Sequence, residues 1–346
     1  MDTNSGARRT RSSSSASSSV TKRNRVSVGG GRRGLHLAAY ARSAGKVKPG
    51  KERLTPTQYV ERKKTGGGEN GGVRVVVLLL GHKGVTRPGA WTALLDACPA
   101  VTLLVHSEAE LPARFEPLRF PRSQVTAWED ISLFVLVRRM LQYALIAYPH
   151  ATVFYTCSGD GIPIVNGDTL EQPWAHVGLP NGAPILGVDP HDTKITVPEW
   201  EPIRQAALSR HGLPHMPPQC YGSQWVGLAR CDAEAVVNAG QKHGAALTGA
   251  YRASYAHAAD GHGMGHARLH PDEEFIPYIL HVLEARAWPD VYGSIMAHCT
   301  AAAPSRCPIC RFRVGHSSVL DPVREERLRR MSPTSLFMRK VDKLEE

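Results

Sequence analysis

No stretch of this 346-residue sequence is apolar for long enough to cross a membrane. The longest apolar run, VRVVVLLLG at residues 73–81, has the size of a β-strand, whereas a membrane helix needs roughly 18 to 20 residues. The N-terminus also lacks the apolar core of a secretory signal peptide. We therefore expect no signal peptide and no transmembrane segment, and a soluble protein in the cytoplasm.

Two glycine-rich nucleotide-binding motifs are absent as well. The stretch LLLGHKGVTRPG carries Gly81 and Gly84 directly after an apolar run, but it matches neither GxGxxG nor GxxxxGK[ST]. Both motifs place backbone amides around phosphate groups, and the glycines allow the close approach. The sequence therefore does not indicate a nicotinamide-dependent enzyme or a P-loop protein.

The 7 cysteines do not form a disulfide scaffold, because their number is odd and their spacing is irregular. A reducing compartment fits this pattern. One CxxC motif is present, at Cys307 and Cys310, but there is no second one at zinc-finger spacing. With His298, Cys299 and His316 nearby, the motif could bind zinc; the alternative is a pair of reduced, partly buried thiols.

Most of the positive charge lies in the first 70 residues. The whole chain has a net charge of +11, whereas residues 1–70 alone hold 16 Lys and Arg against 4 Asp and Glu. Residues 71–346 are therefore close to neutral, which argues against specific nucleic-acid binding by that part. The first segment is rich in Ser, Arg and Gly, so we expect a disordered basic tail. It is either a linker with weak affinity for anionic surfaces or a transit peptide.

Residues 71–346 have the pattern of an α/β domain. Continuous apolar, β-branched runs at 73–81, 100–107 and 151–158 are typical of parallel strands buried on both faces. Between these runs, apolar residues recur at helical spacing at 88–98 and at 130–147, so we expect a helix in each segment. Asp130 or Ser132 is expected to cap the second helix. This order predicts a doubly wound, mostly parallel sheet with its ligand site at the carboxyl ends of the strands.

The second half of the chain is less regular. Residues 179–222 are rich in Pro, His and Gly and show little periodicity, so we expect a long irregular segment there. A short strand is predicted within 222–229, a helix over 231–244, and a final strand at SLFM, 335–338.

Three consecutive acids, Asp272, Glu273 and Glu274, precede an apolar run in the stretch RLHPDEEFIPYIL. Acids in a first turn complement the positive end of the helix dipole, so the stretch is typical of a helix start. The alternative is a catalytic carboxylate held at the edge of a pocket. The local pattern does not separate the two interpretations.

Four segments together resemble the Core-2/I-branching β-1,6-N-acetylglucosaminyltransferase family, and most closely its plant-type branch. The resemblance extends over about residues 73–341, and GSQW with DEExxP is its most specific part. The matching residues are Trp128, Ile131, Ser132, Ala144 and Leu145; Ser158, Asp160, Ile162 and Pro163; Gly222, Ser223, Gln224 and Trp225; and Asp272, Glu273, Phe275, Ile276 and Pro277. The C-terminal SLFMRKV is similar to the closing motif of the family.

The resemblance implies a GT-A-like fold and an enzyme that transfers a sugar, N-acetylglucosamine in this family, from a UDP-sugar to a glycan hydroxyl with inversion. It also implies that no metal or other cofactor takes part. Most GT-A enzymes hold a metal through Asp-x-Asp, and this sequence contains no such motif. Fixed cations must then stabilise the leaving diphosphate. Lys340 is the candidate by motif, and Arg329 or Arg330 by proximity.

The resemblance also assigns roles to individual residues. Glu273 is the general base, with Asp272 as a capping or orienting residue and Glu274 as a solvated neighbour. The donor pocket is formed by Val105, His106, Ser158 and Asp160. On the acceptor side lie Gln224 and Trp225, although Trp225 is equally well explained as a core residue.

Two other functions are compatible with the sequence. A catalytically inactive protein could keep the GT-A-like fold and dock on polyanions through its basic tail. A zinc protein could use Cys307 and Cys310. Loss of UDP binding with retained polyanion binding would indicate the first, and elemental analysis the second.

Overall fold

The computed structural model describes the chain from residue 72 to residue 339 with gaps. The described residues are 72–81, 84–121, 124–127, 130–186, 201–217, 220, 222–259, 268–286, 296–298 and 335–339. All of them belong to one unit of the chain, Thr55–Glu346. The predicted basic tail, the CxxC pair Cys307 and Cys310, and the cations Arg330 and Lys340 lie outside the described residues.

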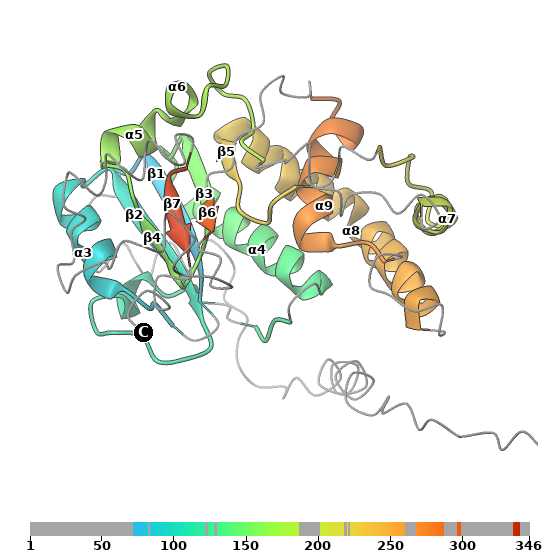
Figure 1. Cartoon of the computed structure of the whole chain (residues 1–346), viewed down its shortest axis with the longest axis horizontal. Helices are drawn as coiled ribbons and strands as arrows, with labels where there is room; N and C mark the ends of the chain where they lie inside the picture. The colour runs from blue at the N-terminus through green and yellow to red at the C-terminus, as the bar shows by residue number, and fades with distance from the viewer. Residues whose placement is uncertain are drawn as a thin grey trace, which may run out of the picture. The chain divides into compact units, whose positions relative to one another are not determined.

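The central sheet consists of β1 (Val75–Gly81), β2 (Val101–Ser107), β3 (Val153–Ser158) and β5 (Gly227–Ala229), in the order β2-β1-β3-β5 (Figure 1). β1 is parallel to both β2 and β3, whereas β5 is antiparallel to β3. Nearly every residue of the three parallel strands is buried, as their continuous apolar runs predict. The expected α/β class with a mostly parallel sheet is confirmed.

Helices cover both faces of this sheet. α3 (Pro88–Ala97) connects β1 to β2, and α4 (Ile131–Ala147) connects β2 to β3 from the opposite face (Figure 1). Alternate residues of β1 separate the two cores: Val77 packs with the α3 side, and Leu78 with the α4 side. Asp130 caps α4 as predicted, since its Oδ1 accepts a hydrogen bond from the Ser132 N–H at 2.8 Å.

The α4 side also carries α8 (Arg230–Ala259) and α9 (Pro271–Tyr278), which continues into the π-helical turn η6 (Ile279–Leu283). The remaining elements are η2 (Glu116–Leu118), β4 (Gly161–Pro163), α5 (Gly167–Glu171), α6 (Pro173–Val177), α7 (Glu201–Arg210), β6 (Met296–His298) and β7 (Phe337–Arg339). Among the described helices, none has both the length and the apolar character that a bilayer-spanning helix requires.

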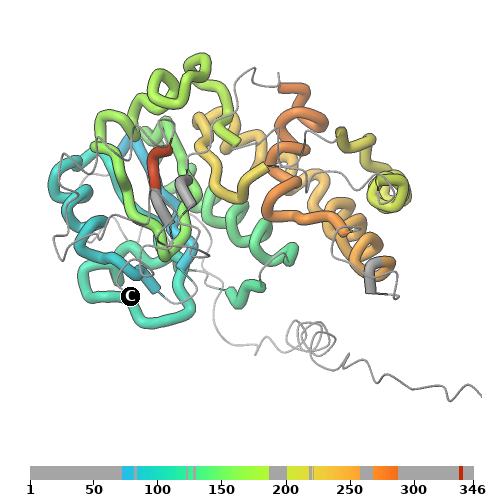
Figure 2. Tube along the Cα trace, in the orientation of Figure 1, coloured from blue at the N-terminus to red at the C-terminus, as the bar shows by residue number. Residues whose placement is uncertain are grey.

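A second sheet, in the order β4-β7-β6, joins the end of the chain to its middle. β7 is antiparallel to β4 and parallel to β6, and it overlaps the predicted final strand. Figure 2 shows the start of this C-terminal strand, in red, among blue and green segments from the first half of the chain. The Phe337 ring is fully buried, with its centroid 6.0 Å from the Trp91 ring and 5.5 Å from the Tyr155 ring.

Two helices differ from the sequence-based expectation. α7 lies inside the stretch 179–222, which the sequence predicts to be irregular. The helix predicted over 231–244 ends at a glycine, whereas α8 continues to Ala259. Leu247 and Tyr251 of α8 are buried against the α4-side core. Their packing outweighs the cost of roughly 1 kcal/mol that a glycine imposes on a helix.

Three glycines bring backbones into contact where β1 and β3 end. The Gly159 N–H donates to the Leu80 carbonyl at 2.8 Å, and the Gly84 N–H donates to the Gly81 carbonyl at 3.2 Å. A Cβ at Gly159 would lie 2.4 Å from the Gly81 Cα and 2.6 Å from the Gly84 carbonyl oxygen. Only a residue without a side chain fits at Gly159.

Replacing Gly159 with Ala should therefore lower the free energy of unfolding by about 1–3 kcal/mol, the cost of overpacking against rigid backbone. Urea denaturation measures this change. Gly244→Ala is the matched control, because nothing lies within 4 Å of the added methyl group inside α8. That variant should be more stable than wild type by up to about 1 kcal/mol. An unchanged urea midpoint for Gly159→Ala would contradict the close approach.

Candidate functional site

The carboxyl edge of the parallel sheet holds most of the predicted donor-binding residues. The strand register aligns Leu80 of β1 with His106 of β2 on one side and with Ser158 of β3 on the other. His106 is 2% and Ser158 is 8% exposed, and Val105 is fully buried in the core. Neither its side chain nor its backbone is exposed, and the Val105 carbonyl accepts a hydrogen bond from the Phe120 N–H at 2.7 Å.

This edge is also where the strand order reverses. From β1 the chain crosses to β2 on one side and then to β3 on the other, which leaves the loops after β1 and β3 adjacent. Ligands of open α/β sheets bind at such a switch point. Asp160, half-buried, lies in the loop that follows Ser158 and leads into β4.

An arginine that the sequence did not single out fixes the loop after β2. Arg119 donates hydrogen bonds to the carbonyl oxygens of Ser107, at 3.0 Å, and Ala109, at 3.2 Å. Its Nε also donates to Glu116 Oε1 at 2.7 Å. The Ser107 hydroxyl completes a tight turn with Ala109. Arg119 thus holds the loop directly beside His106; its only sequence signal is the neighbouring acid at i−3.

The C-terminal motif reaches the same region through the small sheet. Arg339 of β7 is paired with Gly161 of β4, one residue after Asp160. The Gly161 carbonyl accepts a hydrogen bond from the Trp91 indole N–H at 3.0 Å. Lys340 follows Arg339 in the sequence and, like Arg330, lies outside the described residues.

The GSQW segment is fixed between β3 and α9. The Thr156 hydroxyl donates to the Gln224 carbonyl at 2.8 Å, and the Thr156 hydroxyl oxygen in turn accepts a hydrogen bond from the Val226 N–H at 2.8 Å. At the other end, the Gly222 N–H donates to the Glu273 carbonyl at 2.9 Å. Gln224 is half-buried. Trp225 is 4% exposed and packs in the α3-side core, which agrees with the core alternative left open by the sequence.

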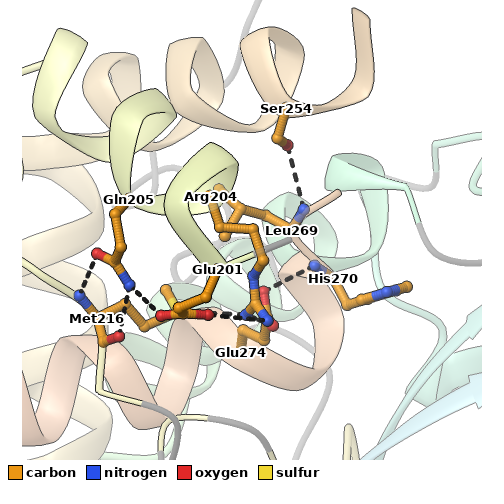
Figure 3. Close-up of polar contacts among 8 residues, drawn as sticks. All are labelled: Glu201, Arg204, Gln205, Met216, Ser254, Leu269, His270 and Glu274. Atoms are coloured by element: carbon orange, nitrogen blue, oxygen red, sulfur yellow. Dashed lines mark hydrogen bonds and ion pairs between the residues drawn. The ribbon is translucent and has the colours of Figure 1, made fainter. Parts of the chain in front are cut away.

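The three acids lie in the first turn of α9, so the predicted helix start is confirmed. The prediction that Glu274 is a solvated neighbour is wrong, because this residue is fully buried. Its Oε1 accepts a hydrogen bond from Arg204 of α7, and its Oε2 accepts one from the His270 N–H at 2.8 Å (Figure 3). A buried carboxylate requires such partners, and Arg204 lies 70 residues away in the sequence.

Asp272 does not cap the helix. The N-cap residue is His270, and no side chain caps it. Asp272 is 8% exposed, and neither carboxylate oxygen has a hydrogen-bond partner from another described residue. Burial, together with the nearby charge of Glu273, raises the pKa of Asp272 from 3.8 to about 7.

Glu273 is the only one of the three acids with appreciable exposed surface, since it is half-buried while both neighbours are buried. The helix hydrogen bond from its N–H to the His270 carbonyl measures 3.0 Å, and its own carbonyl is held by Gly222. A partly desolvated carboxylate on a fixed backbone can accept a proton from a bound hydroxyl. Within the described part of the chain, no group of three or more His, Cys, Asp or Glu side chains is placed to hold a metal ion.

Neither a scan against protein-family models nor a search of curated proteins gave a match for the chain.

Proposed function

We propose that the chain is an inverting, metal-independent glycosyltransferase. It moves a sugar, N-acetylglucosamine by resemblance, from a UDP-sugar to a glycan hydroxyl, with Glu273 as the general base. The observation that carries the proposal is that direct contacts join three of the four segments on which the resemblance rests, and also the C-terminal motif. β4 pairs with β7, Thr156 of β3 binds Gln224, and Gly222 binds Glu273.

Each of these contacts joins segments that are far apart in the sequence. The Thr156–Gln224 bond spans 68 residues, and the pairing of β4 with β7 joins the middle of the chain to its C-terminus. A chance match to four short motifs would not require the motifs to lie together. Their contact supports one site that runs from the carboxyl edge of the sheet to the first turn of α9.

The charges in the proposed site favour one kind of ligand at the carboxyl edge of the sheet and another at the first turn of α9. Around the start of α9 the acidic groups outnumber the cations, because Asp272, Glu273, Glu274 and Asp130 lie near Arg268 and Arg204. Such a region disfavours a diphosphate and suits the uncharged hydroxyls of an acceptor glycan. In the proposal the nucleotide therefore lies at the sheet edge, near His106, and the acceptor near Glu273.

The proposed reaction is a single displacement. The acceptor oxygen forms a bond to the anomeric carbon of the donor sugar while its proton passes to the Glu273 carboxylate. The bond between the anomeric carbon and the diphosphate oxygen breaks, and UDP leaves with both bonding electrons. Attack opposite the leaving group inverts the anomeric centre. Lys340 and Arg330 are the proposed cations that stabilise the leaving diphosphate.

Calorimetric titration of the full chain with UDP and with UDP-N-acetylglucosamine, in EDTA, tests the proposal. We expect binding of both at one site per chain without added metal. Binding that requires Mn²⁺ would contradict the metal-independent mechanism. Absence of binding in either buffer would contradict the glycosyltransferase proposal and favour a non-catalytic protein.

A further inference from the structure

The start of α9 is held by an ion pair that the proposed reaction does not itself use. Arg204 of α7 donates to Glu274 of α9, and the two side chains are 12% and 0% exposed (Figure 3). The Nη1 nitrogen of the same guanidinium lies 3.8 Å from Glu201 Oε2. Removing one partner of such a pair leaves an uncompensated buried charge, so the two residues hold each other in one geometry.

Glu274 connects this pair to the backbone of the helix start. Its second oxygen accepts the His270 N–H at 2.8 Å. One residue earlier, the Leu269 N–H donates to the buried Ser254 hydroxyl of α8 at 3.1 Å. Figure 3 shows the two contacts that reach the start of α9 from neighbouring helices: Arg204 of α7 with Glu274, and Ser254 of α8 with Leu269. The first turn is therefore fixed from two neighbouring helices.

α7 is itself anchored, so that Arg204 has a defined position. The Gln205 side chain forms two hydrogen bonds with the Met216 backbone, at 2.8 and 3.0 Å. Farther along α9, the Tyr278 hydroxyl donates to the Pro214 carbonyl at 2.8 Å. The segment between α7 and the GSQW segment is thus attached to both helices, and the position of α9 depends on α7.

Fixing Glu274 also sets the direction of Glu273. Successive residues of an α-helix are rotated by about 100°, so a helix that points Glu274 into the protein toward Arg204 must point Glu273 elsewhere. In this structure Glu273 is the half-buried residue and Glu274 the buried one. A rotation or shift of the first turn would move the Glu273 carboxylate away from a bound hydroxyl.

We infer that Arg204 is a positioning residue for Glu273, acting through its ion pair with Glu274 on the first turn of α9. This inference rests on the proposed function for its catalytic consequence, but its structural part can be measured separately. Displacement of a catalytic group by about 1 Å can lower a rate by about 100-fold, so a turnover loss of 10- to 100-fold is expected without Arg204.

The test compares Arg204→Met, Arg204→Lys and Glu274→Gln in the full chain. For each variant we would measure UDP-binding stoichiometry, turnover as UDP release from UDP-N-acetylglucosamine, and amide hydrogen exchange by mass spectrometry. In Arg204→Met we expect one UDP site per chain, turnover lowered 10- to 100-fold, and faster exchange in peptides covering 268–280 and 222–229, with 75–81 unchanged. Arg204→Lys, which keeps the charge, should recover part of the turnover. Should Arg204→Met fail to fold, Glu274→Gln removes the same ion pair without a change of shape.

The exposed pair Arg114–Asp96, with side chains 49% and 60% exposed, supplies the control Arg114→Met, which should match wild type in all three measurements. A loss of turnover that only parallels a loss of UDP sites would show a general folding defect and overturn the inference. Unchanged exchange at 268–280 would overturn it as well. If wild type itself binds no UDP, the proposed function fails, and the exchange measurement alone decides whether Arg204 fixes α9.

Discussion

Replacing Glu273 with Gln should lower glycosyl transfer by at least about 100-fold while UDP binding remains unchanged. Glutamine has nearly the same shape but cannot accept the proton of the attacking hydroxyl, and a positioned general base contributes about 10²- to 10⁴-fold to a rate. The donor nucleotide is proposed to bind at the sheet edge, so its affinity should not depend on this carboxylate. Initial rates of UDP release, with calorimetry on the same samples, measure both effects.

The matched control for this variant is Glu284→Gln, the same chemical change at an exposed position just beyond η6. Its turnover should equal that of wild type. Near-normal turnover of Glu273→Gln would remove Glu273 from the mechanism. Equal loss of UDP binding and turnover would instead place Glu273 in the donor site, against the arrangement proposed above.

The features that the sequence predicts correctly are those whose physical cause lies in neighbouring residues of the chain. Buried parallel strands need apolar residues on both faces, so β1, β2 and β3 are visible as uninterrupted runs. The cap at Asp130 and the acids at the start of α9 are equally local, because their physical cause lies within one helical turn.

The parts that the sequence could not predict depend on partners distant in the chain. α7 buries only Ala207 and Leu208, so it has no clear apolar periodicity, and its Gln205 side chain is bonded to the backbone of Met216. Glu274 is indistinguishable from Glu273 in the sequence, and only its ion pair with Arg204 separates a buried acid from a half-buried one. Likewise, Gly240 of α8 lies against the side chain of Arg138 in α4, so an added Cβ would overlap that side chain.

Asp272 should make the protein less stable as the pH rises from about 4 to 8. Its pKa is about 7 in the folded protein, because burial and the Glu273 charge disfavour the ionised form, against an ordinary value of 3.8. Between these values the unfolded chain has lost the proton and the folded chain still binds it. Stability from this group is therefore complete below pH 4 and is lost as the pH rises through 7, by up to about 4 kcal/mol.

Asp272→Asn has no proton to lose, so its stability relative to wild type should increase by up to about 4 kcal/mol between pH 4 and pH 8. Urea denaturation of both proteins at several pH values measures this change, and comparing the two pH values cancels any constant cost of burying the amide. The exposed residue Asp96 provides the control Asp96→Asn, which should stay within about 0.5 kcal/mol of wild type. Parallel pH curves for Asp272→Asn and wild type would mean that Asp272 is solvated or paired in solution. A widening difference would show instead that the first turn of α9 carries a neutral carboxyl group beside Glu273 at pH values below 7.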